Sequence, residues 1–137
     1  MSGINVLIKP ASSMCNLRCS YCFYADEASH REVPSYELMS GDTVTAIIDK
    51  VLACSREYCE FGFQGGEPML AGKAWFRHFV EEARQKNVGG CELRFSLQTN
   101  ATLIDEEWAQ FFKENGFLLG VSLDGPKKTT IIAVEIV

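Results

Sequence analysis

Short apolar segments alternate with amphipathic helical segments along most of the chain, and this order constrains the fold more than any other feature. The apolar, strand-like segments are Ile4–Lys9, Cys59–Gln64, Cys91–Thr99 and Phe117–Leu123. The segments with helical periodicity are Asp42–Cys54, Lys73–Gln85 and Asp105–Asn115. Strands that alternate with helices pair in parallel through right-handed crossovers. We therefore predict an α/β fold with about four parallel strands and three helices.

The length of the chain limits how far such a sheet can close. A closed eight-stranded α/β barrel needs about 250 residues, whereas this chain has 137. Capping residues fit the predicted helices, with Ser40 or Asp42 before the first, and Asn87 and Gly116 after the second and third. The expected architecture is the N-terminal part of an incomplete (β/α) barrel, with a long polar loop over residues 11–41.

The alternation of side chains along each strand predicts two different faces of the sheet. The apolar set, expected to pack on the helices, is Phe61, Phe63, Leu93, Phe95, Leu97, Leu119, Val121 and Leu123. The opposite set is Gly62, Gln64, Arg94, Ser96, Gln98, Asn100, Gly120, Ser122 and Asp124. Ligands of parallel α/β folds bind at the carboxyl ends of the strands. The polar set therefore predicts an open cavity there that holds a ligand.

Charge and hydropathy exclude several classes of partner. The net charge is −5 and no basic run stands out, so we expect no nucleic-acid partner. No apolar run approaches the roughly 20 residues of a membrane span. The N-terminus has no signal-peptide architecture, so we expect a cytoplasmic protein without a membrane partner.

Three of the six cysteines lie within eight residues, directly after the first predicted strand. Cys15, Cys19 and Cys22 have the spacing C-x3-C-x2-C, which lets one loop surround an iron–sulfur cluster. Three ligands would leave one iron of a four-iron cluster free for a cofactor or substrate. Zinc is an alternative, but structural zinc takes four ligands and His30 has no characteristic spacing as the fourth. Three buried or free thiols are the other alternative.

The other three cysteines are dispersed. Cys54 falls on a predicted helix, and Cys59 and Cys91 fall at the starts of predicted strands. Their loose spacing argues against an additional cluster. We therefore expect buried structural thiols.

Three further motifs follow the predicted strands. Gln64-Gly65-Gly66-Glu67-Pro68 ends the second strand, and glycines there would allow unusual backbone angles or close approach of a ligand. Ser122-Leu-Asp-Gly-Pro126 ends the fourth strand, and Leu97-Gln-Thr-Asn-Ala-Thr102 ends the third. Taken singly, the first two could be polar turns.

Together these motifs resemble the radical S-adenosylmethionine (SAM) superfamily, whose signature is C-x3-C-x-aromatic-C after a first strand. The aromatic residue here is Tyr21. The resemblance implies a [4Fe-4S] cluster on Cys15, Cys19 and Cys22, whose free iron is chelated by SAM. An electron from the cluster then yields a 5′-deoxyadenosyl radical, which abstracts a hydrogen from the substrate. The cofactor-binding residues it implies are Tyr21, Gly65, Gly66, Glu67, Asn100 and Ser122.

Four segments are similar, more narrowly, to the anaerobic sulfatase-maturating enzymes: IKPASSMCNLRCSYCFY, FGFQGGEPMLAG, SLQTNATLIDEEWAQFF and SLDGP. That family oxidises a cysteine or serine of a sulfatase precursor to Cα-formylglycine. The resemblance implies catalytic positions for Gln64 and Tyr24 near the substrate and SAM. It also implies a sulfatase precursor polypeptide as partner and a reductant such as flavodoxin or ferredoxin.

The resemblance ends at Lys127. We expect a radical SAM core over residues 1–127 and a divergent apolar tail over residues 128–137, which would form an edge strand or an aggregation hazard. The break suggests a truncated or frameshifted reading frame. Two alternatives therefore stay open: a catalytically inactive fragment that binds the cluster and SAM, and a radical SAM enzyme that modifies another peptide.

Overall fold

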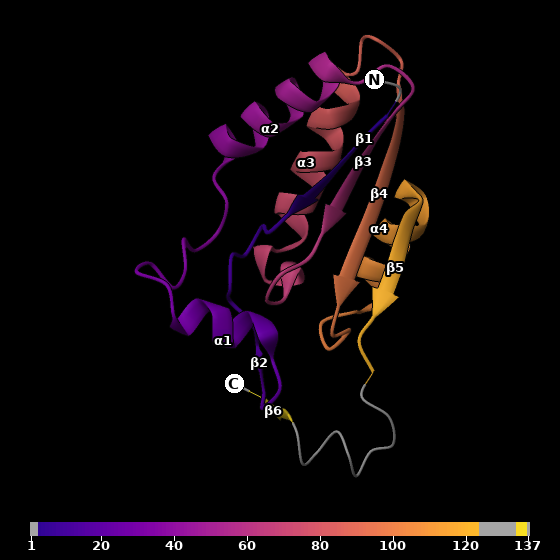
Figure 1. The fold of residues 1–137 in the computed structure, drawn as a ribbon. Coiled ribbons are helices and arrows are strands. Elements are labelled where there is room, and N and C mark those ends of the chain that lie inside the picture. The colour runs from indigo at the N-terminus through magenta and orange to yellow at the C-terminus, as the bar shows by residue number, and fades with distance from the viewer. Residues whose placement is uncertain (1–2, 124–133, 137) are drawn as a thin grey trace.

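The computed structural model describes residues 3–123 and 134–136. Its elements follow the predicted alternation, with further short elements near both ends (Figure 1). In chain order they are β1 (Gly3–Ile8), β2 (Leu17–Cys19), α1 (Phe23–Ser29), α2 (Gly41–Cys54), β3 (Tyr58–Phe63), the 3-10 helix η1 (Pro68–Ala71), α3 (Lys73–Lys86), β4 (Glu92–Thr99), α4 (Glu106–Asn115), β5 (Phe117–Val121) and β6 (Val134–Ile136).

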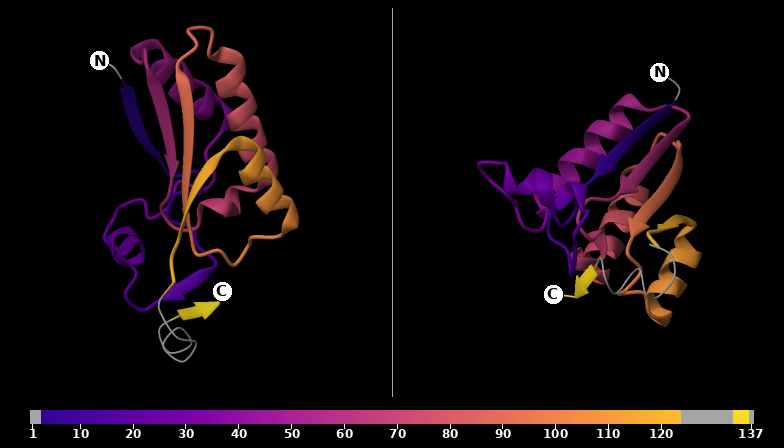
Figure 2. Two further views of the ribbon diagram at one scale, coloured as in Figure 1. Left: turned by 90° about the vertical axis from the view of Figure 1, so that its right-hand side faces the viewer. Right: turned by 60° about the horizontal axis from the view of Figure 1, so that its bottom comes forward.

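Four parallel strands form one sheet in the order β1-β3-β4-β5, so the predicted α/β class is confirmed. Each strand joins its neighbour through a connection that contains a helix, and α2, α3 and α4 lie on one side of the sheet (Figure 2). All four strands end at the same edge. There α1 and β2 lie close to the strand ends (Figure 1).

Aromatic side chains fill the core between the sheet and the helices. The rings of Phe61 and Phe63 each lie near Phe79, with centroids 5.2 and 5.1 Å apart. Trp108 of α4 meets Phe76 of α3 at 5.5 Å. Aromatic pairs of this kind add to the stabilisation from burial. The core therefore fixes the three long helices on the apolar face that strand alternation predicted.

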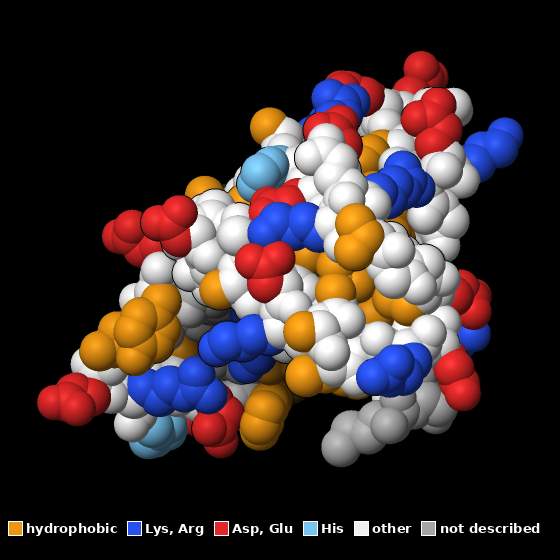
Figure 3. All heavy atoms as spheres, turned by 90° about the horizontal axis from the view of Figure 1, so that it is seen from above, with side chains coloured by type: hydrophobic (Ala, Val, Ile, Leu, Met, Phe, Trp, Pro, Cys, Tyr) orange, Lys and Arg blue, Asp and Glu red, His pale blue; other side chains and the backbone are white. Residues whose placement is uncertain are grey.

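The helix ends agree with the predicted caps. The Ser40 hydroxyl accepts a hydrogen bond from the Thr43 amide and caps α2, and the Asp105 carboxylate caps α4. Gly116 ends α4 in the left-handed conformation (φ 66°) that glycine adopts most readily. Acidic and basic side chains are interspersed on the face shown in Figure 3. Among the described residues, no helix is long and apolar enough to cross a membrane.

The region between residues 11 and 41 was predicted to be one long loop, and this prediction was too simple. It contains the strand β2 and the seven-residue helix α1. A helix this short has no long periodic pattern, which is why periodicity does not reveal it. The structure therefore has four α-helices where three were predicted.

The apolar side chains of β5 differ from expectation. Phe117 packs against the core, but Leu119, Val121 and Leu123 are 37%, 52% and 81% exposed. Among the described residues β5 is an edge strand, and of its side chains only Phe117 packs against the core. Asp124 lies outside the described residues.

Two smaller expectations can also be compared with the structure. Cys54 was expected to be buried and is exposed, whereas Cys59 and Cys91 are buried as expected. In the predicted tail, β6 pairs antiparallel with β2, with Val134 opposite Cys19. The division of the chain at residue 127 stays a prediction.

Candidate cofactor site at the carboxyl ends of the strands

The cysteine loop, residues 11–22, follows β1; Cys19 ends β2 and Cys22 directly precedes α1. Both elements lie near the carboxyl ends of the sheet strands (Figure 1). Cys15, Cys19 and Cys22 are half-buried free thiols. The Leu17 amide donates a hydrogen bond to Cys15 Sγ at 3.4 Å, and Asn100 Nδ2 approaches the same sulfur at 3.8 Å. Amide donors near a sulfur are typical neighbours of a metal-bound thiolate.

Burial raises the pKa of the Cys15 thiol, and the nearby Glu67, Cys19 and Cys22 raise this pKa further; the Leu17 amide acts in the opposite direction. The three cysteines of the loop therefore interact electrostatically across short distances. The raised pKa favours the neutral thiol of Cys15, and a bound cation or cluster would favour its thiolate instead.

Three free thiols closely spaced in sequence are a donor set that a four-iron cluster can take. Within residues 3–123 and 134–136, no three His, Cys, Asp or Glu side chains are grouped closely enough to hold one metal ion. A four-iron cluster does not need such convergence, because each thiolate binds a different iron. Zinc, the alternative, would need its ligands around one point.

The glycine motif lies directly against the cysteine loop. Gly66 adopts a positive φ of 52°, and a Cβ at this position would overlap the backbone carbonyl of Met14. The amide of Glu67 donates a hydrogen bond to that carbonyl oxygen at 2.8 Å. We predicted that the missing side chain of Gly66 leaves space for a ligand. In the structure the backbone of Met14, the residue before Cys15, fills this space.

Glu67 is fully buried, and its carboxylate is used by the protein itself. It accepts hydrogen bonds from the Met69 amide (3.0 Å), the Thr99 hydroxyl (2.9 and 3.0 Å) and the Asn100 amide (2.8 Å). The side chain predicted as a cofactor contact thus joins the glycine motif to the end of β4. Its geometry makes it a positioning residue.

Asn100 completes this junction. Its Nδ2 donates to Asn16 Oδ1 at 3.0 Å, and its Oδ1 accepts from the Thr102 amide and hydroxyl. The predicted residues Cys15, Gly66, Glu67 and Asn100 therefore form one connected group. Sequence reasoning did not single out Asn16, although its position next to Cys15 was a signal.

Gln64 and Tyr24 form a second group. Gln64 Nε2 donates a hydrogen bond to the Tyr24 hydroxyl at 2.5 Å, although the two residues are 40 positions apart. Lys9 Nζ lies 4.7 Å from the centre of the Tyr24 ring, and the Lys9 stem packs where a Cβ of Gly65 would lie. Sequence reasoning also missed Lys9, whose position beside Pro10 gave no sign of this contact.

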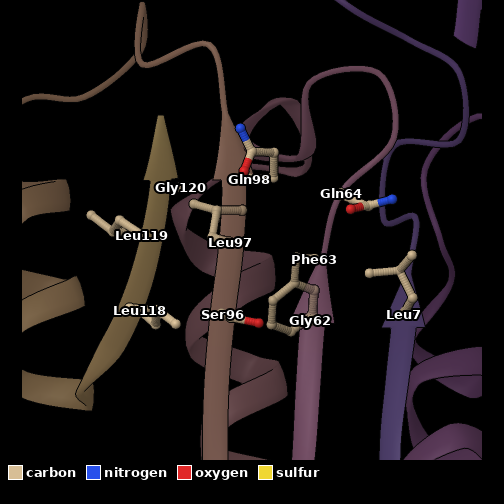
Figure 4. Close-up of a pocket in the computed structure, with 10 residues that line it drawn as sticks. All are labelled: Leu7, Gly62, Phe63, Gln64, Ser96, Leu97, Gln98, Leu118, Leu119 and Gly120. Carbon is tan, nitrogen blue, oxygen red and sulfur yellow. The ribbon is translucent and has the colours of Figure 1, made fainter. Parts of the chain in front are cut away.

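A cavity of about 330 Å³ opens beside these groups on the polar face of the sheet (Figure 4). Residues from all four parallel strands line it: Leu7, Gly62, Phe63, Gln64, Ser96, Leu97, Gln98, Leu118, Leu119 and Gly120. Its volume is at the lower end of the range for small-molecule sites. The predicted placement of Gly62, Gln64, Ser96 and Gln98 on one face is confirmed.

Ser122 lies just beyond this lining. Its hydroxyl accepts a hydrogen bond from Gln98 Nε2 at 2.9 Å, and its amide donates to the Thr99 carbonyl. Tyr21 is 56% exposed and lies within the cysteine loop. The structure thus joins Cys15 to Asn100 and Glu67, Gln64 to Tyr24, and Ser122 to Gln98, whereas the roles predicted for these residues stay predictions.

Comparison with known proteins agrees with this arrangement of a parallel α/β sheet and a cysteine loop. The family model of the radical SAM superfamily matches residues 10–135. The chain therefore belongs to the radical SAM superfamily.

Individual relatives are more specific. The chain is 45% identical over 128 residues to the cysteine-type anaerobic sulfatase-maturating enzyme of Clostridium novyi, covering 93% of this chain and 34% of the relative. The corresponding enzyme of Clostridium perfringens is 48% identical, with 93% and 35% covered. The serine-type enzyme of Bacteroides thetaiotaomicron is 34% identical over 125 residues, with 90% and 30% covered.

Solved structures give the same result. The structure of anSMEcpe with bound AdoMet superposes with a TM-score of 0.89 at 45% identity, covering 98% of this chain and 35% of that one. The structure of anSMEcpe with AdoMet and the Cp18Cys peptide gives 0.88 at 43% identity, covering 99% and 35%. The chain thus matches the N-terminal part of these proteins and spans about a third of their length.

Proposed function

We propose that the chain binds a [4Fe-4S] cluster through Cys15, Cys19 and Cys22, together with S-adenosylmethionine, as the N-terminal part of a cytoplasmic sulfatase-maturating oxidoreductase. When bound, this pair supplies a 5′-deoxyadenosyl radical that removes a Cβ hydrogen from a cysteine or serine on the way to formylglycine. One observation carries the proposal: the segment around Cys15 is held against the glycine motif and Asn100, and Gln64 of that motif lines a cavity.

The residues of the chain have separate parts in this proposal. The Leu17 amide and the Asn100 side chain donate toward Cys15 Sγ, and such donors hold a thiolate in place for a metal. The backbone of Gly65 and Gly66, together with Tyr21 and Ser122, would bind SAM. Glu67 contributes by fixing the glycine motif to β4.

Gln64 and Tyr24 would bind the substrate peptide, because Gln64 lines the cavity and is hydrogen-bonded to Tyr24, which follows Cys22 by two residues. The partner would be a sulfatase precursor, and the higher identity to cysteine-type relatives favours a target cysteine. A reductant such as flavodoxin or ferredoxin would supply the electron.

A second candidate is a chain that binds the cluster and SAM without turnover. The observation that favours this candidate is that the chain matches only 34–35% of the length of its clostridial relatives. A third candidate is the same core acting on a peptide other than a sulfatase.

Replacement of one loop cysteine tests the ligand assignment. After anaerobic reconstitution with iron and sulfide, Cys19→Ala should lose the cluster absorbance and most of the bound iron. Cys54→Ala is the matched control, because Cys54 is exposed on α2 and outside the loop. Iron retained by Cys19→Ala at the level of the unsubstituted chain would refute the assignment.

Turnover separates the candidates. The reconstituted chain is reduced with dithionite in the presence of SAM, and 5′-deoxyadenosine is quantified with and without cysteine-type and serine-type sulfatase peptides. Deoxyadenosine with formylglycine in the cysteine peptide supports the first candidate. A loaded cluster without deoxyadenosine supports the second, and deoxyadenosine without formylglycine in either peptide supports the third.

A further inference from the structure

Two buried cysteines lie side by side at the amino ends of the central strands, far along the strands from the cysteine loop. Cys59 is the second residue of β3, and Cys91 directly precedes β4. Their Sγ atoms are 3.0 Å apart, and the residues are 0% and 7% exposed. The proposed cluster does not use either thiol.

The register of the sheet explains the contact. Cys59 pairs with Leu93, and Cys91 lies two positions before Leu93, so both cysteines direct their side chains to the helix face. Asn87 fixes the backbone of Cys91, donating to its carbonyl at 2.7 Å and accepting from its amide at 3.1 Å. The two sulfurs are therefore held in place by the sheet and by the turn before β4.

The two sulfur atoms are close enough to form a disulfide after a small movement. A disulfide has a sulfur–sulfur bond of about 2.05 Å, so the sulfurs need to approach by about 1 Å from their 3.0 Å contact. Burial and the neighbouring thiol of Cys59 raise the pKa of Cys91 to about 11, while a hydrogen bond with Ser55 acts in the opposite direction. At neutral pH Cys91 is therefore mostly a thiol in the reduced protein.

We propose that Cys59 and Cys91 form a reversible dithiol–disulfide site that small-molecule disulfides oxidise. The small fraction of Cys91 that is deprotonated, which grows as the pH rises toward its pKa, attacks one sulfur of the small disulfide, and the other sulfur leaves as a thiolate. Cys59 then attacks the sulfur of Cys91 and expels the second small thiolate. The two protein thiols lose two protons and two electrons, and the small disulfide is reduced to two thiols.

Cys91 reacts before Cys59 in this scheme because Cys91 is the more exposed of the two. Cys91 follows the exposed residues Val88, Gly89 and Gly90 and is itself slightly exposed, whereas Cys59 is fully buried in β3. Opening of this turn gives a small disulfide access to Cys91, and Cys59 is already beside it. The inference is independent of the proposed function, because it uses neither the cysteine loop nor the cavity.

Peptide mapping of the full chain tests the proposal. The apo chain is incubated with oxidised glutathione, blocked with iodoacetamide and digested with trypsin. Cleavage after Arg56, Lys86 and Arg94 leaves Cys54, Cys59 and Cys91 on three separate peptides. We expect the Cys59 and Cys91 peptides to be joined, at the sum of their masses less two hydrogen atoms. Dithiothreitol should separate them again.

Two controls make the result specific. Cys54 is the exposed comparison and should carry glutathione instead of joining another peptide. The same oxidation in urea should lose the preference for the Cys59–Cys91 pair, because unfolding separates the two sulfurs. A variant with Cys15, Cys19 and Cys22 replaced by Ala removes competing thiols, and the full chain remains informative if that variant does not fold.

The proposal is overturned if Cys59 and Cys91 both carry iodoacetamide after oxidation of the folded chain. It is also overturned if they are joined mainly to other cysteines, or if the pair forms to the same extent in urea.

Discussion

At the scale of single residues, Gly66 has the strictest steric requirement in the site. Its positive φ and its contact with the Met14 carbonyl leave no room for a side chain. The glycine therefore matters for the position of the cysteine loop as well as for any ligand. Its neighbour Gly65 also has a positive φ (87°), but an added Cβ there would meet the flexible stem of Lys9 and no backbone atom among its nearest neighbours.

We predict that Gly66→Ala destabilises the chain and displaces the cysteine loop. A non-glycine residue in the left-handed region costs about 1–3 kcal/mol, and the overlap with Met14 adds to that cost. The free energy of unfolding in urea and the iron content after reconstitution should both fall. Gly89→Ala is the matched control, because nothing lies within 4 Å of its added Cβ. Equal behaviour of the two variants would contradict the steric explanation.

Glu67 allows a second test at this scale. In Glu67→Gln, an amide NH2 replaces one oxygen and faces the Thr99 hydroxyl together with either the Met69 or the Asn100 amide donor. An unpaired buried polar group costs about 1–3 kcal/mol, so the urea midpoint should fall. Glu81→Gln, on the exposed side of α3, should leave it nearly unchanged. A stable Glu67→Gln would show that the carboxylate is not required as an acceptor.

At the scale of elements, an ionic contact joins the starts of α3 and α4. Lys73 Nζ lies 2.6 Å from Asp105 and 2.8 Å from Glu107. Hydrogen bonds from Lys73 hold the pKa of Asp105 below its ordinary value, and those from Lys73 and then Arg77 do the same for Glu107. The Lys73 side chain is 24% exposed and the two carboxylates are 56% exposed, so the contribution to stability is small and depends on salt.

The lowered pKa values of Asp105 and Glu107 determine how the stability contribution of their contact with Lys73 changes with pH. A carboxylate with a lowered pKa stabilises the fold above its unfolded pKa of about 4 and loses this contribution as the pH falls through the folded value. We predict that Lys73→Met lowers the urea midpoint at pH 7 and that the difference from the unsubstituted chain shrinks below about pH 4. Lys50→Met on α2 serves as control and should show no such dependence. A constant difference across this range would contradict the prediction.

The sequence predicted which strands and long helices form better than it predicted which of their side chains are buried. Strand alternation was sufficient to place Gln64, Ser96 and Gln98 on one face, because it needs only local periodicity. It could not predict the exposure of Leu119 and Val121, because burial depends on which element covers an edge strand. Helix α1 was missed because seven residues are too few for a periodic pattern.

In the candidate site, too, motifs of neighbouring residues could be predicted, whereas contacts between residues far apart in the sequence could not. The cysteine spacing and the glycine motif were visible as motifs. The use of the Glu67 carboxylate was not, because its donors on Thr99 and Asn100 are more than 30 residues away. The contact between Cys59 and Cys91 also needs the register of β3 and β4, which periodicity alone does not give.

At the scale of the whole molecule, the described sheet has an apolar open edge at β5. Leu118 and Val121 are 72% and 52% exposed there. Exposed apolar edge strands promote association between chains. We predict that Leu118→Lys with Val121→Lys reduces concentration-dependent association in sedimentation velocity.

Val88→Lys is the control for this prediction, because Val88 is 95% exposed but lies in the turn before β4. It should leave association unchanged. An unsubstituted chain that stays monomeric at all concentrations, or equal effects of both substitutions, would contradict the prediction.

The buried Glu67 carboxylate also sets an order of events during synthesis. Its partners at Thr99 and Asn100 are made long after the cysteines at positions 15–22. A growing chain that ends before residue 99 has all three thiols but lacks the donors that fix the glycine motif beside them. The hydrogen bonds that fix the glycine motif beside the cysteines can therefore form only after Thr99 and Asn100 have left the ribosome, and the proposed cluster would find this arrangement only then.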